Sequence, residues 1–298
     1  MHTNAPAIRT EGLTKHFGDV VALDGLDLEV AQGEVFGFLG PNGAGKTTTI
    51  RLLLHLLRPT AGHAWVHGVP VSDVRRAHRH LGFVSGDVAL WPQLTGQEVL
   101  HLLANLSGEV DAAYRDQLCE RLGLDLSRRI RTLSKGNRQK VALVAALMHR
   151  PDVLLLDEPT AGLDPLMEAE FQQLVREAAA RGQTVFLSSH ILDEVEDVCT
   201  RVAILRGGRL VEIATLESLR QKDVLVLDVS FDGPAPSFVG VPGVVGEQVV
   251  DGRVRISVTG SPQALLGELA RHPVVSLHSR EPDLEEVFLS YYGVPDRR

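Results

Sequence analysis

The chain of 298 residues is long enough for one large domain or two ordinary ones, with a substantial buried core. Its 30 Lys and Arg residues against 38 Asp and Glu residues give a formal net charge of −8, which argues against a general binder of nucleic acid or of an anionic membrane surface. Cys119 and Cys199 are too few for a disulfide framework, and no apolar stretch forms a secretory signal or approaches the roughly 20 residues that span a bilayer.

Alternating strand and helix patterns predict an α/β core with a parallel sheet in residues 1–219. Two of the expected strands, 34–40 and 152–159, have apolar centres, as strands buried on both faces do. Apolar residues three and four positions apart predict a helical subdomain at about 95–149. The expected strands are 20–30 (around a turn), 34–40, 62–68, 152–159 and 184–189, and the expected helices are 46–57, 96–106, 112–124, 137–150, 168–182 and 191–199.

The composition shifts after about Leu219, and residues 220–298 are predicted to form a separate, small α+β domain. An alternating strand, 224–231, is followed by a strand pair that turns at Asp251-Gly252, a strong hairpin signal. Ser261 and Pro262 then provide a cap and a first-turn proline for a helix. A strand at 274–279 and a helix within 281–293 complete the expected order.

A glycine-rich stretch, GPNGAGKT, follows the apolar part of the predicted strand 34–40 and opens a predicted helix. This is the context in which the pattern Gly-x4-Gly-Lys-Thr forms a phosphate-binding loop, or P-loop, whose backbone N–H groups surround phosphate oxygens. Lys46 would reach the β- and γ-phosphates and the Thr47 hydroxyl would be a ligand of Mg²⁺. The predicted nucleotide-binding residues here are Gly40, Pro41, Asn42, Gly43, Ala44, Gly45, Lys46, Thr47 and Thr48.

Two adjacent acids, Asp157 and Glu158, end the apolar strand within 152–159. Alone, the pair could simply cap a strand, but beside a P-loop the first is expected to bind Mg²⁺ and the second to orient the attacking water. His190 ends the next strand, where ligand sites of α/β proteins gather. No Asn-Lys-x-Asp guanine-binding motif occurs, which favours ATP over GTP.

A basic stretch, RTLSKGNRQK at 131–140, is an exception in this acidic chain. It could be a nucleic-acid patch, a solvated surface or part of a site for a compact polyanion. Histidines also occur in two close pairs, His63 with His67 and His78 with His80. Neither pair comes with a cysteine or carboxylate set, so metal binding is discounted there.

Taken together, the P-loop, LSKGN, LLLDEPTAGLD and LSSH resemble, in order and spacing, the nucleotide-binding subunit of ATP-binding cassette (ABC) transporters over about residues 7–218. The resemblance implies a P-loop NTPase fold of the ABC type with ATPase activity. It implies that Phe17 stacks on adenine, that Asp164 lies in the D-loop, and that His190 is the switch histidine that contacts the γ-phosphate. Catalysis would then rest on Glu158, His190 and Lys46.

By the same resemblance, LSKGN is the signature motif, which binds the γ-phosphate of ATP held by a second subunit. Its predicted nucleotide-binding residues are Ser134, Lys135, Gly136 and Asn137. The Ser134 hydroxyl, close backbone approach at Gly136 and a helix that starts at about Asn137 suit an anion. A second copy of the subunit and polytopic membrane subunits are the implied partners, with the chain on the cytoplasmic face of the membrane, in contact with it only indirectly.

Two features depart from the family pattern. The signature has Lys135 and Asn137 where the family has a second glycine and a glutamine. In the Q-loop, the expected Gln or Glu is replaced by Gly86, and we hypothesise that the neighbouring Asp87 takes over a metal- or water-mediated role. Beside this loop, Leu90 and Trp91 either pack within the helical subdomain or form a docking patch for the membrane subunit.

The C-terminal domain, 220–298, resembles the accessory domain of drug and antibiotic exporters in this family, with EPDLEEVFLSYYG as its closing helix. This favours an exporter of drugs, antibiotics or lipids, and leaves open whether the domain is stabilising, regulatory or dimerising. A soluble ABC-type ATPase acting on nucleic acid or ribosomes is the alternative, although the chain has one P-loop and no long coiled coil. A small-molecule kinase would have no use for the signature, D-loop and switch histidine.

Overall fold

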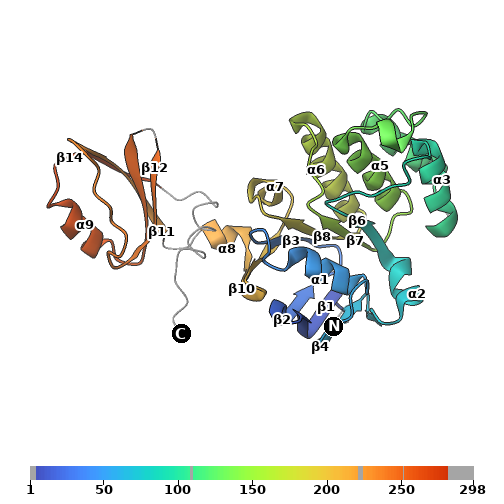
Figure 1. Cartoon of the computed structure of the whole chain (residues 1–298), viewed down its shortest axis with the longest axis horizontal. Helices are drawn as coiled ribbons and strands as arrows, with labels where there is room; N and C mark the ends of the chain where they lie inside the picture. Colours follow the sequence, from blue (N-terminus) through green and yellow to red (C-terminus); the bar gives the residue numbers. More distant parts are fainter. Residues whose placement is uncertain (1–4, 108–109, 221–223, 251, 281–298) are drawn as a thin grey trace. The chain divides into compact units, whose positions relative to one another are not determined.

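The computed structural model describes residues 5–107, 110–220, 224–250 and 252–280, and the chain divides into two units, 1–213 and 214–298 (Figure 1). The sequence placed the corresponding boundary between residues 219 and 220. Within the described residues no helix combines the length and the apolar character needed to cross a membrane.

A six-stranded sheet forms the centre of the first unit, and its consecutive pairs from β9 to β6 are parallel. In order across the sheet, its strands are β10 (Arg209–Thr215), β9 (Arg201–Arg206), β3 (Val35–Leu39), β8 (Thr184–Ser189), β7 (Val153–Asp157) and β6 (Leu81–Val84). Every residue of β3, β7 and β8 is buried, as expected for apolar strands covered on both faces. The predicted α/β core with a parallel sheet is confirmed.

An antiparallel sheet packs with this core. Its strands, in order, are β2 (Val20–Val30), β1 (Ile8–Phe17), β4 (Ala61–Val66) and β5 (Val69–Pro70). Apolar side chains of this sheet and of the first helix share one buried cluster with Phe36 and Phe186 of the parallel sheet. The predicted turn inside 20–30 does not interrupt the strand: Gly25 adopts a positive φ of 64° and β2 continues through it.

Helices cover the parallel sheet, and Figure 1 shows α3, α5 and α6 on one side of it, with α1 and the antiparallel sheet on the other. The helices are α1 (Lys46–Leu53), α2 (Val74–Ala77), α3 (Gly96–Ser107), α4 (Ala112–Arg121), α5 (Lys135–Leu147), α6 (Pro165–Ala180) and α7 (Asp193–Glu196), with 3-10 turns η1 (His78–His80) and η2 (Ile130–Thr132). Two helices depart most from their predicted lengths. Helix α1 stops before His55, which has a positive φ of 52°, and α7 covers only four residues of the expected 191–199.

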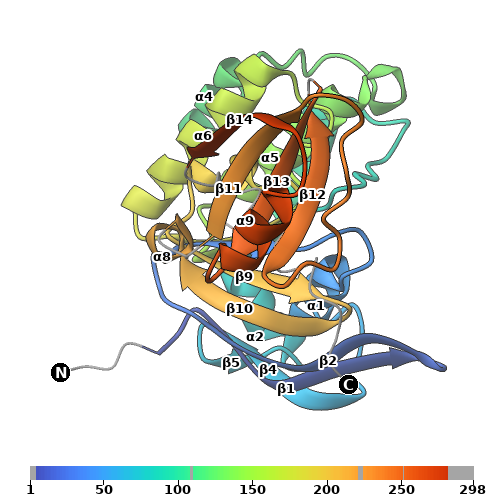
Figure 2. The same ribbon diagram turned by 90° about the vertical axis from the view of Figure 1, so that its left-hand side faces the viewer.

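In its described residues the second unit contains an antiparallel sheet with a helix packed on it (Figure 2). After α8 (Leu216–Arg220), its strands in sheet order are β12 (Val244–Val250), β13 (Arg253–Thr259), β11 (Val224–Phe231) and β14 (Val274–Arg280), and the helix is α9 (Gln263–Leu269). Leu265 and Leu269 of α9 join Ile256 and Phe238 in its core. The helix predicted within 281–293 lies outside the described residues.

Phe238 is the largest fully buried side chain of this second core, and its ring stacks on Phe231 at a centroid distance of 5.9 Å. Phe238→Ala leaves a cavity that the sheet can only partly close, so we expect the unit to lose about 3–5 kcal/mol of stability. Its neighbour Val239 is 80% exposed, and Val239→Ala is the matched control with little expected effect. Urea unfolding of the two variants checks this, and equal midpoints would contradict the packing described.

Candidate functional site

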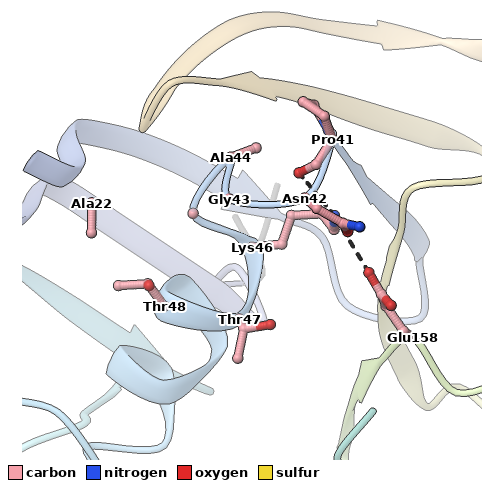
Figure 3. Close-up of a pocket in the computed structure, with 10 residues that line it drawn as sticks. Ala22, Pro41, Asn42, Gly43, Ala44, Lys46, Thr47, Thr48 and Glu158 are labelled. Atoms are coloured by element: carbon pink, nitrogen blue, oxygen red, sulfur yellow. Dashed lines mark hydrogen bonds and ion pairs between the residues drawn. The ribbon is translucent and has the colours of Figure 1, made fainter.

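The P-loop connects β3 to α1 and surrounds a small cavity of about 140 Å³ (Figure 3). Gly45 caps α1 with a φ of 111°, and a Cβ atom there would lie 2.6 Å from the Ala22 carbonyl oxygen. Only glycine tolerates both this positive φ and this close approach of the backbone. The cavity is lined by Pro41, Asn42, Gly43, Ala44, Gly45, Lys46, Thr47 and Thr48, together with Ala22 and Glu158. The helix N-terminus and the free N–H groups around it suit a bound phosphate.

Lys46 is 95% buried at the base of this cavity. Its Nζ donates hydrogen bonds to the carbonyl oxygens of Gly40 at 2.6 Å and Pro41 at 3.3 Å, and it lies 3.5 Å from Glu158 Oε1. Burial lowers the pKa of the Lys46 ammonium, and the Glu158 carboxylate partly offsets that effect. A cation held in this way can turn towards an anion that enters the loop.

Glu158 contacts both the P-loop and the end of β8. Its backbone adopts a left-handed φ of 45°, uncommon for a residue other than glycine, and its N–H donates to the Ser188 carbonyl oxygen at 3.1 Å. Its Oε1 lies 3.5 Å from Lys46 Nζ and 3.2 Å from His190 Nδ1. The three predicted catalytic residues, Lys46, Glu158 and His190, are therefore neighbours in the structure.

Asp157 ends β7 with its side chain 96% buried. Ser188, in the neighbouring strand β8, donates a hydrogen bond from Oγ to Asp157 Oδ1 at 2.6 Å. The sequence predicted no role for Ser188, although it belongs to the LSSH motif. The signal available in the sequence was its position two residues before His190, near the end of the predicted strand 184–189. The hydrogen bond fixes one carboxylate oxygen and leaves the other for a ligand.

The signature residues lie at the start of α5, and the residues that line the P-loop cavity include none of them. Ser134 is the N-cap, with Oγ accepting a hydrogen bond from the Asn137 N–H at 3.2 Å. The helix thus begins at Lys135, two residues before the predicted start, because the Ser134 side chain satisfies a free N–H group of the first turn. The signature therefore does not line the cavity formed by the P-loop of its own chain.

The D-loop packs directly on the signature. A Cβ atom at Gly136 would lie 2.4 Å from the Gly162 carbonyl oxygen, so only glycine fits there. Asp164 caps α6 and accepts a hydrogen bond from the Met167 N–H at 3.1 Å. The fully buried Gln139 donates from Nε2 to the Pro159 carbonyl oxygen at 3.0 Å. This last contact, which sequence reasoning missed, connects the signature helix to the segment that follows Glu158.

Two other predicted regions lie at the borders of the site. Phe17, at the end of β1, has 47% of its surface exposed, and β2 brings Ala22 from the adjoining strand to the cavity. Gly86 faces the end of β7: a Cβ atom there would lie 3.0 Å from the Asp157 carbonyl oxygen. The absence of a side chain at this position therefore permits a close approach, and the neighbouring Asp87 is exposed.

Comparison with known proteins gives a consistent result. Residues 23–161 match the family described as ABC transporter. A daunorubicin resistance ATP-binding protein of Streptomyces coeruleorubidus is 38% identical, over 98% of this chain and 97% of the relative. A bacitracin transport ATP-binding protein of Enterococcus faecalis is 31% identical over 96% of both chains.

Solved structures match about 70% of the chain. An ATP-binding subunit of an ABC transporter superposes with a TM-score of 0.67 and 30% identity, over 72% of this chain and 92% of that chain. A dimeric ATP-binding cassette in a post-hydrolysis state, bound to ADP and Pi, gives a TM-score of 0.65 and 25% identity, over 70% of this chain and 98% of that chain.

Proposed function

The chain belongs to the ABC transporter family as an ATP-binding, ATP-hydrolysing subunit, and from this premise we propose that it powers an exporter of drugs, antibiotics or lipids. The observation that carries the catalytic part is that Glu158 lines the P-loop cavity with its Oε1 within 3.5 Å of both Lys46 Nζ and His190 Nδ1. Glu158 orients the attacking water, while Lys46 and His190 hold the γ-phosphate. Release of phosphate from ATP by the purified chain, with and without Mg²⁺, tests this directly.

The residues present fit a Mg²⁺ ion. Asp157 and Thr47 offer the hard oxygen ligands that Mg²⁺ prefers, and Ser188 holds the buried Asp157 carboxylate in place. When bound, the ion would neutralise charge on the β- and γ-phosphates. The P-loop from Gly40 to Thr48 would hold the phosphates and Phe17 the adenine.

The second half of each ATP site is proposed to come from another copy of the chain. Ser134, Lys135, Gly136 and Asn137 would contact the γ-phosphate across the interface, and Asp164 would lie beside them in the D-loop. Support comes from the dimeric relative and from the separation of the signature from the chain's own P-loop cavity. Two copies then close on two ATP molecules and reopen after hydrolysis.

Export and the membrane partner are supported by the relatives that extend along nearly the whole chain, one named for daunorubicin resistance and one for bacitracin transport. The proposed partner is a polytopic membrane protein, which would hold the subunit at the cytoplasmic face. The exposure of Trp91, at 47%, favours the docking alternative for the loop after β6 over core packing. The alternative of a soluble ATPase acting on nucleic acid or ribosomes is not favoured.

Asp87 is proposed to replace the missing Q-loop side chain, because Gly86 brings this loop against the end of β7. We expect Asp87→Ala to raise the Mg²⁺ concentration needed for half-maximal ATPase activity by about 10-fold, the size typical of losing an outer-shell ligand partner. Asp87→Asn, which keeps the shape without the charge, separates charge from packing. Unchanged activity in Asp87→Ala at every Mg²⁺ concentration would exclude the role.

The transport assignment is tested by co-expression with a polytopic membrane protein encoded beside this chain. We expect the two to co-purify, and cells that express both to accumulate less of an exported drug. Cells that carry the Glu158→Gln subunit are the control, because they hold the same complex without its ATPase activity. Equal drug accumulation in all strains would contradict export while leaving the ATPase assignment intact.

A further inference from the structure

Two histidines and an aspartate meet in the first unit, and none of them lines the P-loop cavity. His67 lies in the turn between β4 and β5, His80 ends η1 directly before β6, and Asp152 directly precedes β7. Their possible ligand atoms all lie within 4.8 Å of one another. From the sequence, metal binding was discounted because neither histidine pair, 63/67 or 78/80, came with a carboxylate. The fold instead groups the second histidine of each pair with Asp152.

Backbone hydrogen bonds fix the positions of two of the three residues. The His67 N–H donates to the Ala7 carbonyl oxygen at 2.7 Å, and the Asp152 carbonyl oxygen accepts from the Thr184 N–H at 2.8 Å. His67 also adopts a left-handed φ of 51°, a conformation that surrounding structure must maintain in a residue other than glycine. The two imidazole rings are nearly parallel, with centroids 4.9 Å apart and an interplanar angle of 9°.

The donor set selects a class of ion. Imidazole nitrogen and carboxylate oxygen are ligands of Zn²⁺ and its late first-row neighbours, whereas Mg²⁺ and Ca²⁺ prefer oxygen alone. His80 Nδ1 lies 2.5 Å from Asp152 Oδ2. A tetrahedral Zn²⁺ with bonds of about 2.0–2.2 Å needs its ligand atoms about 3.4 Å apart, so this pair must separate by roughly 1 Å. The Asp152 side chain is half exposed and has room to do so.

We propose that His67, His80 and Asp152 form a Zn²⁺ site with three protein ligands and one open position. The ligands come from the antiparallel sheet, from the segment before β6 and from the segment before β7 of the parallel sheet. A bound ion therefore crosslinks the two sheets of the first unit. Because the unfolded chain lacks this arrangement, binding stabilises the folded state.

The test uses the full chain, purified without a polyhistidine tag, stripped with a chelator and kept free of nucleotide so that the P-loop site does not contribute. Titration calorimetry with Zn²⁺ is expected to show one ion per chain. Zn²⁺ at about 100 times its Kd should raise the Tm by roughly 5 °C. Mg²⁺ should neither bind at one ion per chain nor raise the Tm. Bound Co²⁺ should show the visible d–d absorption of a tetrahedral site.

His67→Asn and Asp152→Asn are the test variants, since Asn tolerates the left-handed backbone at residue 67 and matches the shape of Asp at residue 152. Each is expected to weaken Zn²⁺ binding at least about 10-fold. His63→Asn, an exposed histidine of β4 outside the proposed ligand set, is the matched control and should bind as the parent does. Thermal melting without Zn²⁺ checks that each variant folds. The Co²⁺ spectrum is recorded on the parent protein, so this result does not depend on the folding of any variant. Absence of binding, or equal binding by all four proteins, would overturn the proposal.

Discussion

Replacing Glu158 with Gln is expected to lower ATP hydrolysis by about 10²–10⁴-fold, the contribution typical of a positioned general base. Gln keeps the size of the side chain and removes the charge that faces Lys46 Nζ and His190 Nδ1, both within 3.5 Å of Oε1. The P-loop itself is untouched, so ATP affinity should change little. With ATP bound and not hydrolysed, the variant should accumulate as a dimer. Phosphate release, nucleotide binding and size-exclusion chromatography with light scattering measure these three results.

The matched control is Glu120→Gln, an exposed glutamate of α4, which should hydrolyse ATP as the parent does. A Glu158→Gln protein that remains monomeric with bound ATP would count against closure of two copies on the nucleotide. If the Glu158→Gln protein hydrolysed ATP at the parent rate, Glu158 would not be the residue that orients the attacking water.

Replacing Ser134 with Asp is the second large expected loss. Asp caps a helix as well as Ser does, so the start of α5 is preserved, yet the carboxylate stands where the γ-phosphate of a partner's ATP is proposed to bind. Two like charges about 4 Å apart near a protein surface repel by about 4 kcal/mol, which corresponds to roughly 10³-fold. ATPase activity should fall on that scale, while ATP affinity of the monomer stays at the parent value.

Ser134→Asn is the control for this substitution, because it retains the cap and carries no charge. We expect it to keep far more activity than Ser134→Asp. If the two variants are equally active, the residue does not face a phosphate. If Ser134→Asp also weakens binding of ATP to the monomer, the signature serves its own chain's P-loop rather than a partner's.

Residues that are close in the chain carried most of the correct predictions. The α/β core follows from apolar strands that alternate with amphipathic helices, and the position of GPNGAGKT between a strand and a helix follows from the same local patterns. The exact ends of helices were predicted less well, because they depend on caps and backbone conformation at single residues. The start of α5 depends on which hydroxyl caps it, and the end of α1 on the positive φ at His55.

Contacts between distant segments were not predictable in the same way. Ser188 reaches Asp157 because β8 and β7 are neighbours in register, and Gln139 reaches Pro159 because α5 packs beside the segment after β7. The meeting of His67 and His80 with Asp152 depends on how two sheets and a short turn pack together. A single sequence shows each of these residues, but not which strand edge or turn will lie beside it.

The central claim is that each ATP site is completed by a second copy of the chain, and mixing two inactive variants tests it most directly. Lys46→Ala disables the P-loop and keeps the signature, while Ser134→Asp disables the signature and keeps the P-loop. In a mixed dimer, one site combines the intact P-loop of one copy with the intact signature of the other. Phosphate release is therefore predicted to reappear when the two proteins are combined. A mixture as inactive as its components, under conditions where the parent hydrolyses ATP, would contradict the account.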